Sequence, residues 1–334
     1  MPSSLSAVPD IDEQLAQVVL ERLALVEERL RQSVATNDHL ARWTARHLLD
    51  AGGNRVRPML VLLAAALGDV QRDEVIDAAV LVELTHLASL YHDDVMDSAS
   101  TRRGTKAAHE VWGNNVAILT GDFLFARASR LSSRLGTEAV RLHSLTFERL
   151  CLGQLHETVG PQEGEDPFDH YISVLADKTA SLLALAGELG ALQSGAPEGT
   201  GDVMRRYGEK VGVAFQLADD VLDLESDPGT SGKTPGTDLR EGVPTMPTLL
   251  VRRRARAGEQ DAQALVARLD GDLSDDSVLA DVVAQLRTDP ALAETRALAH
   301  RTADEAASIL EELPEGPVRR SLTAFTRTLV HRSR

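Results

Sequence analysis

Apolar residues recur along most of the chain at spacings of three and four, the repeat of a helix with one buried face. Alternation with a period of two, which would indicate strands, is absent. A more charged helical segment occupies residues 258–334. The pattern therefore predicts an all-α protein, with helices before that segment at roughly 11–35, 38–50, 58–68, 72–96, 113–135, 137–159, 168–194 and 198–225.

Gly and Pro mark the breaks between these helices. Gly52-Gly53 ends one predicted helix, and Pro58 suits the first turn of the next. Asp227–Pro247 is the longest irregular stretch between helices, and a long polar loop of this kind often carries function. We expect residues 1–10 to form a flexible leader and residues 11–334 a single all-α domain.

Composition and charge exclude several classes of partner. Aromatic residues make up only 3% of the chain, which further disfavours a sizeable sheet. The net charge of −16 argues against nucleic acid or an anionic membrane as the main partner. The single cysteine, Cys151, rules out an intrachain disulfide and predicts a reducing, cytoplasmic location. The longest apolar run, Met59–Leu67, is too short for a transmembrane segment.

The same acidic pattern, DDxxD, occurs twice, at residues 93–97 and 219–223. One copy alone would be typical of a solvated acidic face, but here each copy follows an apolar stretch. On a helix the first and last Asp of each motif share a face, and like charges at that spacing repel unless a cation lies between them. Oxygen-only ligands favour Mg²⁺, which shares its shell with substrate phosphates. The two motifs therefore predict a small Mg²⁺ cluster that holds a diphosphate.

Basic residues lie at positions where a phosphate site would need them. Arg suits bidentate phosphate recognition, and Lys supplies a point charge. His86 lies two helical turns before the first motif on the same face, so it is either a substrate contact or a core histidine. The candidate cations are Arg55, Arg57, Arg102, Arg103, Lys178 and, in the loop after the second motif, Lys233.

These motifs together resemble the trans-isoprenyl diphosphate synthases (polyprenyl synthetases), most closely the bacterial long-chain members. The resemblance is strong across roughly residues 40–250. It implies an isoprenoid synthase fold, a bundle of long helices around a deep central cavity, and usually a homodimer. The matching stretches are 52–58, 86–103, 113–114, 121–122, 178–180, 215–220 and 236–239.

The resemblance also implies a prenyltransferase that condenses isopentenyl diphosphate (IPP) head to tail onto an allylic diphosphate, with a cluster of up to about three Mg²⁺ ions. Asp93 and Asp97 would bind Mg²⁺ from one wall with Asp94 in support, and Asp219 from the other with Asp220 and Asp223 nearby. Arg102, Lys178 and Lys233 would hold the allylic diphosphate. Arg57, His86 and Arg103 would hold IPP, and Thr179 and Gln216 would line the reacting centre.

Two features of the sequence bear on the affinity for IPP and on the length of the product. The family usually has Lys where this chain has Asn54, so a charged contact to IPP is missing. Ala88 and Ser89 precede the first motif and are small, with Thr85 one turn deeper, whereas a bulky aromatic at these places stops elongation in the family. We therefore expect an open tunnel, lined from the facing helix by Ala117 and Ile118, and long products.

Several alternatives stay open at this stage. One is a short-chain synthase with products of about C15–C20. A second is a non-catalytic subunit of a heteromeric synthase, although such subunits typically lack acidic motifs. A class I terpene cyclase would carry an Asn/Ser/Glu triad in place of the second motif and an aromatic-rich pocket. An acidic helical scaffold would leave the joint spacing of the motifs unexplained.

Overall fold

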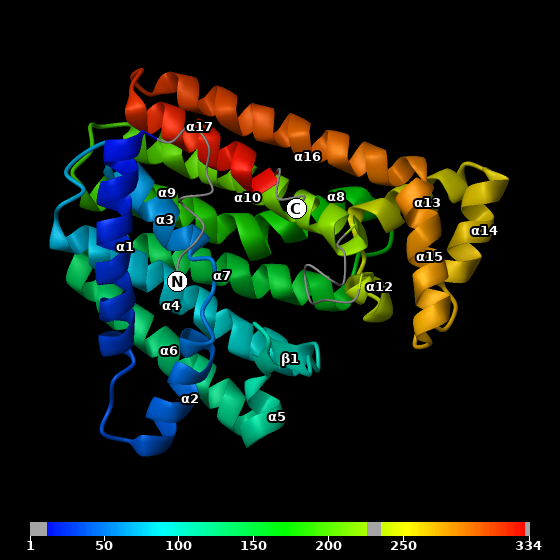
Figure 1. The fold of residues 1–334 in the computed structure, drawn as a ribbon, viewed down its shortest axis with the longest axis horizontal. Coiled ribbons are helices and arrows are strands. Elements are labelled where there is room, and N and C mark those ends of the chain that lie inside the picture. Colours follow the sequence, from blue (N-terminus) through cyan, green and yellow to red (C-terminus); the bar gives the residue numbers. More distant parts are fainter. Residues whose placement is uncertain (1–11, 226–234, 331–334) are drawn as a thin grey trace. The chain divides into compact units, whose positions relative to one another are not determined.

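The computed structural model describes residues 12–225 and 235–330, so the expected leader at residues 1–10 and Lys233 lie outside the described residues. The chain is almost wholly helical (Figure 1). The elements are α1 (Glu13–Ser33), α2 (His39–Asp50), α3 (Val56–Ala65), α4 (Asp73–Met96), β1 (Thr101–Arg102), β2 (Thr105–Lys106), α5 (Ala108–Trp112), α6 (Asn114–Leu135), α7 (Thr137–Val159), α8 (Pro167–Leu175), the π-helical turn η1 (Ala176–Ala180), α9 (Ser181–Gln193), α10 (Thr200–Glu225), α12 (Thr237–Arg240), α13 (Met246–Arg256), α14 (Gln260–Leu269), α15 (Asp276–Thr288), α16 (Pro290–Ile309), the 3₁₀ turn η2 (Leu310–Glu312) and α17 (Pro317–Val330).

The helices predicted from periodicity are confirmed to within a few residues at most ends, and the fold class is all-α as expected. The range 168–194 is interrupted by η1, where five residues form a π-helical turn. The sequence analysis also missed the hairpin β1–β2, in which Thr101 pairs with Lys106. Strands of two residues are too short to show a period of two, and this hairpin turns through Arg103 and Gly104, both at positive φ.

By its internal contacts the described chain divides into two compact units, each assembled from separate segments. The first unit contains residues 12–150, 181–208 and 309–325. The second contains residues 151–180, 209–225, 235–308 and 326–330. The first motif, DDxxD at 93–97, belongs to the first unit, and the motif at 219–223 belongs to the second.

The core of the first unit is built around α3 and α4. Nearly every residue of α3 is buried, and α4 is buried without interruption from Val75 to Thr85. Helices that are buried on all sides in this way belong inside a core. α4 lies against α6, and α3 lies against α9 (Figure 1). These two buried helices position the first acidic motif, which occupies the last turn of α4.

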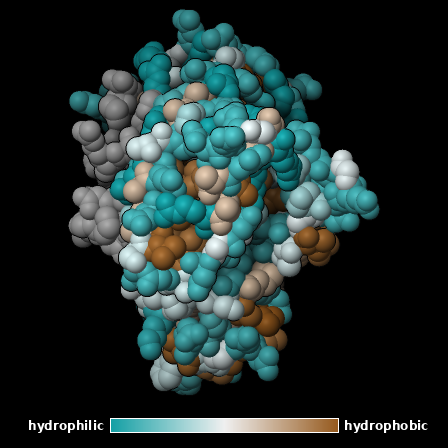
Figure 2. Space-filling model, turned by 90° about the vertical axis from the view of Figure 1, so that its right-hand side faces the viewer, coloured by the Kyte–Doolittle hydropathy of each residue, from teal (hydrophilic) through white to brown (hydrophobic). Residues whose placement is uncertain are grey.

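The second unit has a separate apolar core formed by α8, α10 and α13–α16, with Leu217, Leu250 and Val282 among its fully buried members. α8 contacts η1, which follows it in the chain, and α8 also contacts α13. The face drawn in Figure 2 is largely hydrophilic with separate hydrophobic patches. That surface agrees with the large excess of acidic residues. Of the helices described, none combines the length and apolarity that crossing a bilayer requires.

Close packing of α3 and α9 depends on Gly190. A Cβ atom at this position would lie 2.3 Å from the carbonyl oxygen of Val61 and 2.9 Å from Cβ of Ala64. Both helices are buried, so neither can move aside freely. The glycine therefore sets the distance between the two helices.

We expect Gly190→Ala to lower the free energy of unfolding by about 1–3 kcal/mol, because the added methyl overpacks the core. Gly201→Ala in α10 is the matched control, since its nearest heavy atom would be Cγ of Glu188 at 3.8 Å. The control should be neutral or slightly stabilising. Urea denaturation of both variants measures the difference, and equal stabilities would show that Gly190 does not limit helix approach.

Candidate active site

In the first motif, the second aspartate points inward. The side chain of Asp94 is fully buried and accepts a hydrogen bond of 2.6 Å from Nε of Arg102, which comes from strand β1. Burial raises the pKa of the Asp94 carboxyl, and the neighbouring Arg102 opposes that rise. Asp93 is half-buried and Asp97 is exposed. Arg102, predicted as a phosphate ligand, is thus held by the motif itself.

The second motif repeats this arrangement on α10. Asp220 is 2% exposed, and its Oδ2 accepts hydrogen bonds from the Tyr171 hydroxyl at 2.6 Å and from the Met246 backbone N–H at 2.9 Å. Burial raises the pKa of Asp220 to about 7, although the two donors act to lower it. Asp219 and Asp223 are half-buried and, being four residues apart, share a face of the helix.

Both motifs therefore bury one hydrogen-bonded carboxylate, and each also carries two carboxylates one helical turn apart. In the residues described, no group of three or more acidic, His or Cys side chains encloses a metal position. Each such pair is a partial set of hard oxygen ligands, which fits Mg²⁺ because that ion keeps several waters and binds substrate phosphates. Asp93 with Asp97, and Asp219 with Asp223, are the residues that would hold it.

Lys178 and Thr179 lie in the π-helical turn η1. Lys178 is ion-paired with Glu157 of α7, and the Thr179 hydroxyl donates a hydrogen bond of 3.3 Å to Oε1 of Gln216 on α10. Single π-helical turns inside helices are frequent at functional sites. The structure thus brings together two of the residues expected at the reacting centre.

Two glycines allow neighbouring helices to enclose this turn. A Cβ atom at Gly153 of α7 would lie 2.8 Å from the backbone nitrogen of Lys178. One at Gly212 of α10 would lie 2.4 Å from Cα of Ala180. Real Cβ atoms do not approach other atoms this closely, so any larger residue would displace the turn. Packing of helices α7 and α10 therefore fixes the backbone that carries Lys178 and Thr179.

The residues expected to hold IPP meet in the first unit. His86 is half-buried, and its pKa is lowered well below the usual value by burial and by the guanidiniums of Arg57 and Arg103. The imidazole is thus neutral at pH 7 and can donate one hydrogen bond. Arg103 donates to the carbonyl oxygens of Leu48, at 3.1 Å, and Gly52. Asn54 lies exposed on the same loop as Gly52.

The positions expected to control product length are also in the first unit. Ala88 is fully buried, and Ser89 is half-buried with its hydroxyl donating to the carbonyl oxygen of His86. The expectation for the facing helix was half wrong. Ala117 is buried, but Ile118 is 40% exposed, because neighbouring helical residues point about 100° apart.

One turn deeper, Thr85 is paired with a residue that the sequence analysis did not single out. Its hydroxyl donates to the carbonyl oxygen of Leu81 at 2.9 Å and lies 3.0 Å from Nε2 of His143 on α7. Burial lowers the pKa of His143 to about 4, so its ring is neutral. The region below Ser89 therefore contains a buried polar pair, where the sequence suggested only small and aliphatic side chains.

Two further side chains at the site carried no sequence signal. Glu157, the partner of Lys178, stands among exposed residues near the end of α7. Tyr171 lies on a separate helix from Asp220 and is distant from it in sequence. Only the folded chain shows these pairs. Lys233, expected at the allylic diphosphate, lies outside the described residues.

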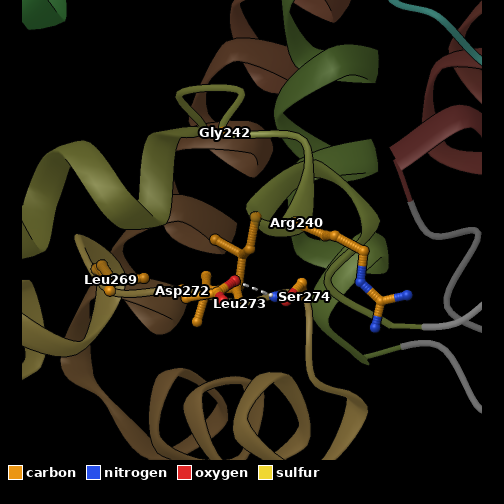
Figure 3. Close-up of a pocket in the computed structure, with 8 residues that line it drawn as sticks. Arg240, Gly242, Leu269, Asp272, Leu273 and Ser274 are labelled. Atoms are coloured by element: carbon orange, nitrogen blue, oxygen red, sulfur yellow. Dashed lines mark hydrogen bonds between the residues drawn. The ribbon is translucent and has the colours of Figure 1, made fainter.

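A pocket in the second unit contains none of these residues (Figure 3). Its volume is about 360 Å³, and it lies between the end of α12 and the loop that follows α14. The backbone N–H of Ser274 donates to Asp272 within its wall, and the Arg240 side chain points away from Leu269. None of the residues predicted to bind metal or substrate lines this pocket, so we do not assign it to the active site.

Comparison with known proteins agrees with this geometry. A family model described as polyprenyl synthetase matches residues 39–286. The chain is 41% identical over 334 residues to the nonaprenyl diphosphate synthase of Mycobacterium tuberculosis, covering 99% of this chain and 98% of the relative. The chain therefore belongs to the polyprenyl synthetase family.

Relatives within the family differ in product and assembly. The crystal structure of a geranylgeranyl pyrophosphate synthase from Corynebacterium glutamicum, complexed with calcium and isoprenyl diphosphate, matches with a TM-score of 0.85 and 40% identity, covering 96% of this chain and 98% of that one. The heptaprenyl diphosphate synthase component 2 of Geobacillus stearothermophilus is 35% identical, covering 89% of this chain and 91% of the relative. The likeness to this crystal structure establishes the isoprenoid synthase fold.

We expect Gly212→Ala to weaken binding of inorganic diphosphate in the presence of Mg²⁺ by about tenfold, because the added methyl displaces the turn that carries Lys178. Isothermal titration calorimetry measures this affinity. Gly201→Ala on the same helix is the control and should bind as the wild type does. Unchanged affinity in a folded Gly212→Ala variant would show that the turn does not position a diphosphate ligand.

Proposed function

We propose that this protein is a Mg²⁺-dependent prenyltransferase that condenses IPP head to tail onto an allylic diphosphate and releases an all-trans polyprenyl diphosphate. The observation that carries the proposal is the repeated arrangement of the two DDxxD motifs, each with one buried, hydrogen-bonded carboxylate and two further carboxylates one helical turn apart. The names of the relatives support the reaction class, and the Mycobacterium tuberculosis relative supports a long-chain product.

The reaction requires the protein to stabilise a leaving group and to position two substrates. Breaking the allylic C–O bond leaves a carbocation and a diphosphate with increased negative charge. Bound Mg²⁺ would supply positive charge to that diphosphate. Lys178 and Arg102 add fixed positive charge, while Arg57, Arg103 and neutral His86 hold the diphosphate of IPP. The IPP double bond attacks the cation, and the released diphosphate accepts the proton that is lost.

We further propose a homodimer, a single domain and a cytoplasmic location. Leu119 of α6 is 66% exposed and its neighbour Ile118 is 40% exposed, an apolar pair that a second copy of the chain would cover. A single domain is supported because the two compact units are interleaved along the sequence. The location rests on the lone Cys151, which is typical of a reducing compartment.

The decisive experiment is incorporation of radiolabelled IPP by the purified protein alone, with and without Mg²⁺, followed by sizing of the dephosphorylated products. Mg²⁺-dependent chain elongation is the expected result. Failure of the lone protein to elongate any allylic starter would favour a subunit of a heteromeric synthase. Cyclised hydrocarbon products would indicate a terpene cyclase.

We expect Asp93→Ala and Asp219→Ala each to lower kcat by orders of magnitude, about 10²-fold or more, because each removes a charged ligand of the leaving-group site. Thermal stability should hold or rise, since the substitution relieves repulsion within the motif. Steady-state kinetics and melting curves test both statements. Near-normal turnover in either variant would show that the substituted residue is not a metal ligand.

The loop position Asn54 offers a gain-of-function test. We expect Asn54→Lys to lower the KM for IPP about tenfold, since a charge-assisted hydrogen bond to phosphate is worth about 1.5–3 kcal/mol. The KM for the allylic substrate should change less. Asn54→Gln is the control of similar size without charge. An unchanged KM for IPP would mean that another group already neutralises this part of the diphosphate.

Product length tests the small residues before the first motif. We expect wild-type products of about C30 or longer, and Ser89→Phe or Ala88→Phe should shorten them to about C15–C20 by closing the path along α4. Mass analysis of the dephosphorylated products gives the lengths, and Ser89→Ala controls for loss of the hydroxyl. Wild-type products of chiefly C15 or C20 would mean that other residues stop elongation and that the open-tunnel prediction is wrong.

A further inference from the structure

One buried carboxylate lies within the cationic part of the first unit and has no role in the chemistry above. The side chain of Glu83 on α4 is 2% exposed. Its Oε1 is 2.8 Å from Nη1 of Arg55 and 3.8 Å from Nη2 of Arg103. A buried carboxylate loses its hydration, and this loss destabilises the protein unless positively charged or hydrogen-bonding partners offset it. Two arginines from two different loops provide that compensation.

Arg55 holds the loop between α2 and α3. Its side chain is 3% exposed, and it pairs with Glu27 of α1 as well as with Glu83. The guanidinium also donates to the carbonyl oxygens of Leu49, at 3.4 Å, and Gly52, at 3.3 Å. Arg55 has φ of 49°, a conformation unfavourable for a residue with a side chain. The ion pairs keep the loop in a backbone shape that it would not adopt alone.

Arg103 reaches the same loop from the hairpin β1–β2. It donates to the carbonyl oxygens of Leu48 and Gly52, and its guanidinium lies against Gly53. A Cβ atom at Gly53 would be 2.8 Å from Cζ of Arg103, so only glycine permits this approach. The loop that carries Asn54 is therefore enclosed between two arginines, and Glu83 lies beside both.

We propose that Glu83 is a positioning residue for IPP: through Arg55 and Arg103 it fixes the loop that presents Asn54, and with it the first turn of α3 that presents Arg57, to the IPP diphosphate. The proposal rests on the proposed function and adds a residue that touches no reacting atom. Glu83 also offsets the positive charge gathered around His86, whose neighbours include Arg55, Arg57, Arg102 and Arg103. Without it, Arg103 would keep only backbone carbonyls as partners in this group.

The chain offers a matched control on the same helix. Asp77 of α4 is also a buried carboxylate bound by two arginines, Arg29 at 2.5 Å and Arg134 at 3.1 Å. Neither arginine is expected at the site. Loss of either carboxylate should lower the melting temperature, but only Glu83 should affect IPP.

The experiment compares Glu83→Gln with Asp77→Asn by steady-state kinetics with each substrate varied in turn. Glu83→Gln should raise the KM for IPP about tenfold, with a smaller change in kcat and in the KM for the allylic diphosphate. Asp77→Asn should leave the KM for IPP at the wild-type value. Equal shifts in the two variants, or an effect of Glu83→Gln on kcat alone, would overturn the proposal.

Arg55 gives a second route if Glu83→Gln does not fold. Arg55→Gly removes the side chain but suits the positive φ, and it should raise the KM for IPP, whereas Arg55→Lys should restore part of the affinity. A wild-type KM for IPP in Arg55→Gly would also overturn the proposal. A wild-type protein that incorporates no IPP at all would instead contradict the proposed function, so the two failures are distinguishable.

Discussion

Repulsion between carboxylates one helical turn apart is the constraint around which the site is organised. Each DDxxD motif concentrates three negative charges in little more than one turn, which a helix tolerates poorly. The fold buries one carboxylate of each motif against specific donors, Arg102 for Asp94 and Tyr171 with the Met246 backbone for Asp220. Asp93, Asp219 and Asp223 are half-buried and Asp97 is exposed, and a hard cation such as Mg²⁺ would relieve the repulsion within each pair.

Glycines at helix contacts supply the precision that such a site needs. Gly153 and Gly212 let α7 and α10 approach the π-helical turn closely enough to fix Lys178 and Thr179. Gly53 allows the Arg103 guanidinium to lie on the loop that carries Asn54. At the π-helical turn, the absence of these two side chains lets two helices contact the backbone directly, and a backbone held in this way has little freedom to shift.

The helices and the acidic motifs were predictable because their signals are local. Apolar spacing of three and four reports a buried helix face, and it placed α4 and α10 correctly. The hairpin around Arg103 and the π-helical turn were not predictable in this way. Two-residue strands show no alternation, and a π-helical turn differs from its flanking helix in hydrogen bonding, with no sequence signature of its own.

The sequence by itself determined the all-α class, the two repeated acidic motifs and the resemblance to polyprenyl synthetases. The motifs could be interpreted because residues four apart on a helix share a face whatever surrounds them. Tertiary structure alone decided which aspartate of each motif is anchored and which partners hold Arg55, Lys178 and Thr85. Those partners, Glu83, Glu157 and His143, lie far from the motifs they support or carry no pattern of their own. Such pairs depend on how separate helices pack, and packing is a property of the folded chain.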